Sequence, residues 1–297
     1  MIFEWTCDSN QTISVIEFLR SRQVPRRFIT RLKFNQGDIQ INGQSVTVRA
    51  HLSQGDRLTL IAPDENGHDT VIPSDAPIDI VYEDRDLLVV NKPTNVVSIP
   101  SKRNPDSAMA NRIKGYYLRQ GYSDQVIHIV TRLDRNTTGL MLIAKHRLAH
   151  AWMDQQIRQE MLKKYYYAIS HRSEWPQHGF IDGPIARSEA SIITRKVDPS
   201  GQEALTEFWL TDRMMDSALL RIRLYTGRTH QIRVHFAHMG GPLVGDDLYG
   251  GRIEAPLMRQ ALHCGELQFI QPFTQEALVI KQTLPMDMVE WMRQRNI

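Results

Sequence analysis

The first seventy residues carry a pattern of apolar positions that is typical of two short helices followed by strands. Thr12 is suited to an N-cap, and residues 13–19 hold an apolar stripe at helical spacing. Pro25 is suited to the first turn of a second helix, where its missing N–H costs no hydrogen bond. The alternating residues 39–41 run into Asn42-Gly43, a strong hairpin signal, and residues 57–60 alternate again. We therefore expect a small helix-helix-strand unit.

Short, continuously apolar runs indicate strands buried on both faces in the rest of the chain, at residues 87–90 and 140–144. Residues 148–161 have the pattern of a helix. Further strands are expected at residues 165–169, 207–210, 219–224 and 277–281. The predicted fold class is α+β: a large mixed, mainly antiparallel sheet flanked by helices and loops, with the small unit in front of it.

A polar stretch rich in turn formers, Pro63–Asp69, separates the two patterns, and prolines follow at positions 73 and 77. A length of 297 residues accommodates two domains. We expect a small domain over residues 1–70, a linker at 71–78 and a larger domain over 79–297.

Composition narrows the class of protein. With 41% apolar and 23% charged residues the chain can bury a core, and its net charge of +3 does not by itself indicate a nucleic-acid partner. Cys7 and Cys264 lie far apart without a zinc-binding spacing, and free thiols are a simpler interpretation than a disulfide. The chain has neither a signal-peptide pattern nor the ~18 consecutive apolar residues of a membrane helix. We expect a soluble, cytoplasmic protein, and nothing demands more than a monomer.

Positive charge is concentrated between residues 20 and 33, which include six Arg or Lys and no acid. On the second predicted helix, Arg27 and Arg31 lie four residues apart, where like charges repel by about a few tenths of a kcal/mol. This arrangement favours a polyanionic partner, because phosphate contacts dominate nucleic-acid affinity. A solvated helix face explains the charge equally well.

The most informative stretch is Thr131–Gly139, which leads directly into the apolar run at 140–144. Asp134 stands between Arg132 and Arg135, whose positive charges keep a carboxylate ionised. Carboxylates act as covalent nucleophiles toward sugar carbons, as in glycosidases. By themselves, the same residues also fit a surface loop of salt bridges capped by threonines.

Thr131–Gly139 resembles the central R-L-D-x-x-T-S-G motif of the RluA-type pseudouridine synthases. Lys164–Ala168 resembles the K-x-Y-x-A segment of that family, and Thr226–His235 its T-G-R-x-H-Q-I-R-x-H segment. With residues 82–93 upstream and 241–263 downstream, the likeness covers about residues 79–290 in order.

Three positions depart from the family pattern. Thr131 stands where many relatives have His, Thr138 replaces the usual Ser, and Thr94-Asn95 replaces a more typical Ala-Gly pair. None of these changes removes a group that the chemistry needs.

The resemblance implies conversion of uridine to pseudouridine in RNA. This reaction breaks the N1–C1′ bond, rotates the uracil and joins C5 to C1′. Because it adds no atoms and changes no redox state, no cofactor and no metal are expected. The implied catalytic residues are Asp134, Tyr166 and Arg233, with Arg233 forming a bidentate fork on the carboxylate of Asp134. The implied substrate contacts are Arg132, Arg228 and His230; Arg132 either fills the space of a flipped-out base or contacts phosphate.

The N-terminal pattern of helix, basic helix and hairpin resembles the alpha-L RNA-binding motif over about residues 13–60. This second resemblance implies RNA binding through Arg26, Arg27, Arg31 and Lys33. It favours ribosomal RNA over transfer RNA as the partner.

Two other interpretations were weighed. His230, His235 and His238 suggest a metal site, but no His-Glu-x-x-His or Cys pairing completes one. If residues 232–236 form a strand, Arg233 and His235 share a face and His230 precedes them in a turn. The alternative of a different class is an RNA-binding or ribosome-assembly factor that keeps the fold without catalysis.

Overall fold

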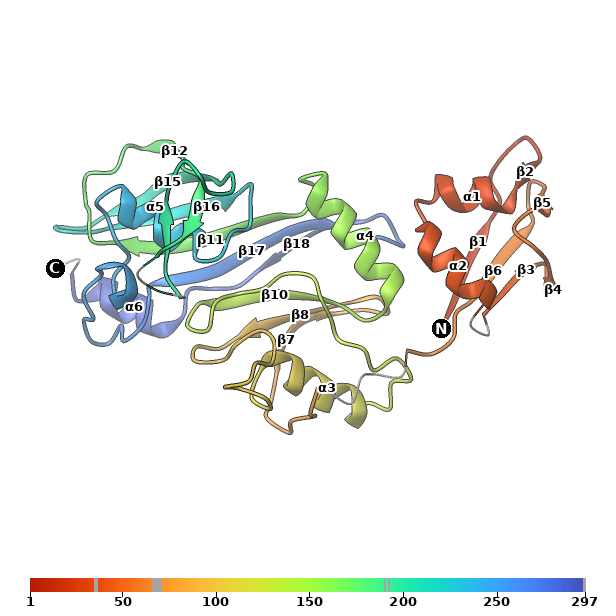
Figure 1. Ribbon diagram of the computed structural model, residues 1–297, viewed down its shortest axis with the longest axis horizontal. Coiled ribbons are helices and arrows are strands. Elements are labelled where there is room, and N and C mark those ends of the chain that lie inside the picture. The colour runs from red at the N-terminus through yellow and green to blue at the C-terminus, as the bar shows by residue number, and fades with distance from the viewer. Residues whose placement is uncertain (35–36, 66–70, 190, 192, 296–297) are drawn as a thin grey trace.

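The structure is a computed structural model that describes residues 1–34, 37–65, 71–189, 191 and 193–295. In the N-terminal unit, helices α1 (Val15–Ser21) and α2 (Arg26–Phe34) pack on a small sheet (Figure 1). The strands of this sheet follow the order β1 (Ile2–Thr6), β6 (Arg57–Ile61), β3 (Asp38–Ile41) and β4 (Gln44–Ser45). Strand β2 (Ile13–Ser14) pairs with β5 (His51–Leu52) beside it.

The N-cap of the first helix is Ser14, two residues after Thr12, so the prediction of an N-cap at Thr12 is wrong. The Ser14 side chain accepts from the backbone N–H of Glu17, while the Glu17 carboxylate accepts from the N–H of Ser14. This reciprocal capping box satisfies two backbone donors at the helix start, which Thr12 cannot reach. Strand β1, which the sequence pattern missed, is a short edge strand that places Phe3 in the core.

The larger unit is built on one long sheet. Its strands follow the order β12 (His178–Asp182), β15 (Leu205–Arg213), β16 (Ala218–Leu224), β11 (Lys163–Ser170), β17 (Leu262–Ile270), β10 (Thr138–Ala144), β8 (Leu87–Lys92) and β7 (Asp79–Glu83). Strand β18 (Ala277–Lys281) pairs with β17, and β9 (His128–Ile129) pairs with β10. A separate hairpin consists of β13 (Ile185–Arg187) and β14 (Arg195–Val197).

One parallel pairing joins the two halves of this sheet. Strands β10 and β17 run parallel where Thr138 meets His263 and Gly139 meets Cys264. The other pairs of described strands in the sheet are antiparallel. The predicted class is confirmed: the chain is an α+β protein with a large mixed, mainly antiparallel sheet. The loop that leads into β10 lies at the junction between the two halves.

Helices cover both faces of the sheet. Helix α4 (Arg147–Arg158) and α5 (Gln231–His238) pack over one face, and α3 (Met109–Arg119) covers β7, β8 and β10 from the other (Figure 1). Leu140 and Leu142 point to the α4 side, and Met141 and Ile143 to the α3 side. This double burial explains why β10 is apolar without alternation. Helix α6 (Met286–Arg293) packs beside β11 and β16.

Residues 232–236 would place Arg233 and His235 on one face if they formed a strand, but they belong to helix α5. Residues 231–236 of α5 are all buried. A helix that is buried on nearly all sides has no amphipathic stripe, so its sequence lacks the helical period. Arg233 and His235 therefore do not share a face. His235 is turned toward Thr206 and Gly183, with both of its ring nitrogens within 2.9 Å of oxygens there.

The N-terminal unit is packed against α4. Leu148 and Trp152 of α4 belong to the same apolar cluster as Phe3, and the Trp152 indole N–H donates to the carbonyl of Gln23 at 3.2 Å. Part of the polar break, residues 66–70, lies outside the described residues. Just before it, Glu65 is buried, and its carboxylate lies 2.9 Å from the His128 ring. Of the helices that the structure describes, none is both long and apolar enough to cross a membrane.

Candidate active site

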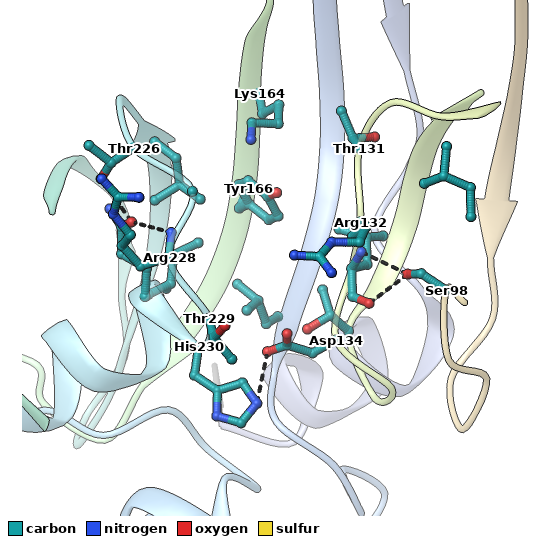
Figure 2. A pocket seen from close by; sticks show the side chains of 18 of the residues that line it. Ser98, Thr131, Arg132, Asp134, Lys164, Tyr166, Thr226, Arg228, Thr229 and His230 are labelled. Carbon is teal, nitrogen blue, oxygen red and sulfur yellow. Dashed lines mark hydrogen bonds and ion pairs between the residues drawn. The ribbon is translucent and has the colours of Figure 1, made fainter. Parts of the chain in front are cut away.

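A cavity of about 690 Å³ opens between the loop that precedes β10, strand β11 and the start of α5 (Figure 2). Asp134, Tyr166, Arg233, Arg132, Arg228 and His230 all line it. The structure thus brings together the six residues implied by the first resemblance, although they lie up to 101 positions apart in the chain. The four basic residues of α2 are not among the residues that line this cavity.

The Asp134 loop is held by side chains from outside it. The Ser98 hydroxyl accepts from the N–H of Leu133 and donates to its carbonyl, at 3.0 and 2.7 Å. The Lys92 ammonium donates to the Arg135 carbonyl at 2.9 Å, and Arg259 donates to that of Asn136 at 3.2 Å. Such cross-links fix the position of the carboxylate between them.

Gly139 allows the loop to enter β10 at this point. Its φ is +109°, and a Cβ there would lie 2.2 Å from the carbonyl oxygen of Cys264. Both the left-handed backbone and the close approach of β17 therefore require glycine.

Arg233 contacts Asp134 but is anchored by another residue. Its Nη1 lies 3.4 Å from the Asp134 carboxylate, whereas its Nε and Nη2 donate to the two oxygens of Asp246 at 2.7 Å each. The prediction of a bidentate fork on Asp134 is wrong, because Asp246 occupies that face of the guanidinium. Burial alone would lower the pKa of Arg233, but Asp246 and Asp134 together raise it.

Asp246 has no exposed side-chain surface, whereas the Asp134 side chain is 28% exposed. Asp246 thus neutralises the charge of Arg233 from the buried side and leaves Asp134 facing the cavity. The sequence analysis gave Asp246 no role in the site. Its place in the downstream segment that resembles the family was the signal available for it.

His230 presents its other edge to the same carboxylate. Its Nε2 lies 3.8 Å from Asp134, and its Nδ1 lies 2.8 Å from the Tyr249 hydroxyl. That hydroxyl accepts from the backbone N–H of Arg195 at 3.0 Å, so its single proton is available for Nδ1. Burial lowers the pKa of His230, although Asp134 opposes this effect. The other ring nitrogen, Nε2, faces Asp134.

Strand β11 forms the wall between the two sides of the cavity. Tyr166 and Lys164 point to the same face by strand alternation, and Figure 2 shows them one above the other. Burial raises the pKa of Tyr166 well above its ordinary value, so its hydroxyl keeps its proton. Burial lowers the pKa of Lys164. Behind Tyr166, burial raises the pKa of the free thiol of Cys264 to about 12.

Arg132 and Arg228 stand on opposite walls of the cavity (Figure 2). Both residues are exposed, and Arg228 is steadied by a bond from its Nε to the Glu203 carbonyl at 2.9 Å. Two cations that face each other across a hollow are suited to an anionic ligand.

No group of three or more metal-ligating side chains occurs among the described residues. The donor set of the cavity is instead a carboxylate, a phenol, an imidazole, ammonium and guanidinium groups.

Comparison with known proteins identifies the family. The sequence model described as RNA pseudouridylate synthase matches residues 86–238. The uncharacterized RNA pseudouridine synthase YjbO of Bacillus subtilis is 42% identical, over 96% of this chain and 100% of that protein. Ribosomal large subunit pseudouridine synthase D of Haemophilus ducreyi is 37% identical, over 73% of this chain and 70% of that protein.

A solved structure shares the fold. Human RNA Pseudouridylate Synthase Domain Containing 4 superposes with a TM-score of 0.60 at 21% identity, covering 73% of this chain and 92% of that one. The chain therefore belongs to the RNA pseudouridylate synthase family and is an isomerase that acts on RNA.

Proposed function

We propose that this protein converts specific uridines of structured RNA into pseudouridine, with the carboxylate of Asp134 as the catalytic group. The observation that carries the proposal is a partly exposed carboxylate whose buried side is held by Arg233 and whose open side faces a cavity lined by Tyr166 and Lys164. The proposed substrate is ribosomal rather than transfer RNA. Relatives 35–37% identical to the chain are named ribosomal large subunit pseudouridine synthase D.

The Asp134 carboxylate is placed to react with the ribose of the target uridine, or to stabilise that ribose once the uracil has detached. Two groups hold the Asp134 carboxylate on its buried side: Arg233 Nη1 lies 3.4 Å from it and His230 Nε2 lies 3.8 Å from it. A carboxylate in a water-poor cavity with a fixed partner is reactive, whereas an unpaired one would become protonated. The isomerisation transfers C1′ from N1 to C5, and the proton lost from C5 balances the one gained at N1.

Tyr166 and Lys164 are proposed to contact the uracil ring. The protonated hydroxyl of Tyr166 can donate to the ring or pass a proton near C5, and its aromatic face provides a stacking surface. The positive charge of Lys164 lies on the same wall and would stabilise the negative charge that develops on the uracil when the N1–C1′ bond breaks.

The target uridine must leave its helix to enter the cavity, at a cost of about a few kcal/mol. Arg132, two residues before Asp134, is exposed at the rim and is proposed to fill the vacated stack or to hold the adjoining phosphate. Arg228 contacts the backbone from the opposite wall. Residues 1–70 are proposed to be the RNA-binding domain, with α2 as its phosphate-binding helix, and residues 79–297 the catalytic domain.

The deciding experiment is tritium release from large-subunit ribosomal RNA labelled at uracil C5. We expect release with the wild-type protein and none with Asp134→Asn, which keeps the size of the side chain but removes the charge. Filter binding should give the two proteins similar RNA affinity. If both proteins bind RNA and neither releases tritium, the protein is an RNA-binding or assembly factor and the proposal fails.

A further inference from the structure

A second, polar groove of about 570 Å³ adjoins the catalytic cavity. Arg132, Gly227, Arg228 and Thr229 line both hollows, so the two are contiguous. The space beside Gly227 is open, because a Cβ there would approach no atom closer than the Lys164 ammonium at 3.8 Å. A chain held in the cavity can therefore continue into the groove.

Four arginines line the groove, namely Arg132, Arg187, Arg195 and Arg228. No Asp or Glu among the described residues lines it. Ser200 and Gln202 add uncharged hydrogen-bonding groups. Several positive charges together with neutral donors are the composition of a phosphate-binding surface.

The hairpin of β13 and β14 places two of these arginines directly opposite each other. Arg187 pairs with Arg195 in the register, which brings their Cβ atoms to about 4.5–5.5 Å. Like charges at this spacing destabilise a hairpin, and a polyanion lying across them removes that cost. Hydrogen bonds from Arg195 Nη1 to the carbonyls of Ile193 and Thr194 hold the Arg195 guanidinium near the hairpin end.

The same hairpin is linked to the catalytic carboxylate. The backbone N–H of Arg195 donates to the Tyr249 hydroxyl, which bonds His230, which faces Asp134. Three contacts thus separate the groove from the carboxylate. An RNA strand bound along the hairpin would therefore be aligned with the entrance of the cavity.

We propose that this groove binds the phosphodiester backbone of the RNA segment next to the target uridine, through Arg187 and Arg195. The ligand rests on the proposed function, because the segment belongs to the same RNA whose uridine enters the cavity. A free anion would need neither the length of the groove nor its continuity with the cavity.

The test is RNA affinity measured by filter binding to an unmodified transcript of large-subunit ribosomal RNA. The double substitution Arg187→Gln with Arg195→Gln is made in the full chain that also carries Asp134→Asn, so that no turnover occurs. We expect affinity to fall about tenfold at near-physiological salt, and the slope of log affinity against log salt to decrease by about 1–2.

Lys196→Gln is the matched control. Lys196 lies next to Arg195 on β14 but does not line the groove. Its ammonium pairs instead with Asp198 at 2.7 Å. The Lys196→Gln substitution removes a positive charge from the same hairpin and should leave the RNA affinity and its salt slope unchanged. Arg187→Lys keeps the charge and should retain most of the affinity. Arg187→Gln alone, at an exposed position, should give part of the loss without disturbing the fold.

Turnover by the otherwise wild-type protein provides the second measurement. The double substitution should raise KM for the transcript and leave kcat within about twofold, because the groove positions RNA away from the reacting atoms. Unchanged affinity and salt slope would overturn the groove assignment. Weakened binding by a protein that releases no tritium from any RNA would support the groove and refute the proposed function, so the two failures differ.

Discussion

At the scale of single residues, the geometry of the cavity depends on Asp246. This buried carboxylate holds two of the guanidinium nitrogens of Arg233, and the third nitrogen is left to face Asp134. Without Asp246, Arg233 could rotate to form its fork on Asp134 and withdraw the carboxylate from the cavity.

We therefore predict that Asp246→Asn lowers kcat by about 10²-fold, since a misplacement of ~1 Å has effects of that size. It should also lower the free energy of unfolding by about 3–5 kcal/mol, because the arginine loses its buried counter-charge. Tritium release and urea unfolding measure the two effects. The control is Asp247→Asn, which changes the adjacent, exposed carboxylate and should alter neither quantity. Near-normal turnover by a folded Asp246→Asn protein would show that Arg233 needs no such anchor.

At the scale of the helix, α2 has an arrangement of charge that works against its own stability. Arg26 and Arg27 occupy the first turn, which has no acidic residue, and both are exposed. Cations at a helix N-terminus oppose the helix dipole, at roughly 0.3–1 kcal/mol each. Phe28, Ile29 and Leu32 bury the opposite side of the helix. These charges therefore do not stabilise the helix, and a polyanionic partner would compensate them.

Replacement of Arg26 and Arg27 by Gln should therefore weaken RNA binding without weakening the fold. We expect the salt slope of RNA affinity to decrease by about 2, and the free energy of unfolding to stay level or to rise. Filter binding over a salt series and urea unfolding test this. Gln at Arg119 and Arg293, which end α3 and α6, removes equal charge elsewhere and should change the slope less. Equal slopes for both double variants would mean that α2 makes no specific contact.

At the scale of the whole molecule, α4 connects the N-terminal unit to the cavity around Asp134. Its first half packs Leu148 and Trp152 into the core of that unit, and Ile157 near its end lines the cavity. Helix α4 thus contacts both the N-terminal unit and the cavity, and Figure 1 shows it between that unit and the large sheet.

Trp152→Ala should separate the two units. Loss of a buried Trp costs about 3–5 kcal/mol, and we expect the single thermal transition of the wild type to split into two in scanning calorimetry. The KM for long RNA should rise, because a loosely tethered unit binds at a lower effective concentration. Phe34→Ala, in the same unit but at a residue 79% exposed, should do neither. One sharp transition at an unchanged temperature would mean that the contact with α4 contributes nothing to the docking.

Elements were predictable where their pattern reflects one-sided or complete burial. Strands β8 and β10 appear in the sequence as apolar runs, and the hairpin at Asn42-Gly43 follows from turn chemistry, with φ of +51° and +83° at these residues. Helix α5 was not predicted, because burial on nearly all sides removes the helical period. The hairpin of β13 and β14 was missed, since strands of three residues carry too little pattern.

The sequence alone determined the family, the fold class and the identities of the residues that now line one cavity, because local motifs keep their spacing wherever the chain folds. The tertiary structure alone decided that Asp246 rather than Asp134 receives the fork of Arg233, and that Arg187 and Arg195 extend the cavity into a basic groove. Those facts depend on which side chains from distant segments share a space, and on which of them burial makes pair. The local order of residues encodes neither the spatial proximity of distant side chains nor their pairing on burial.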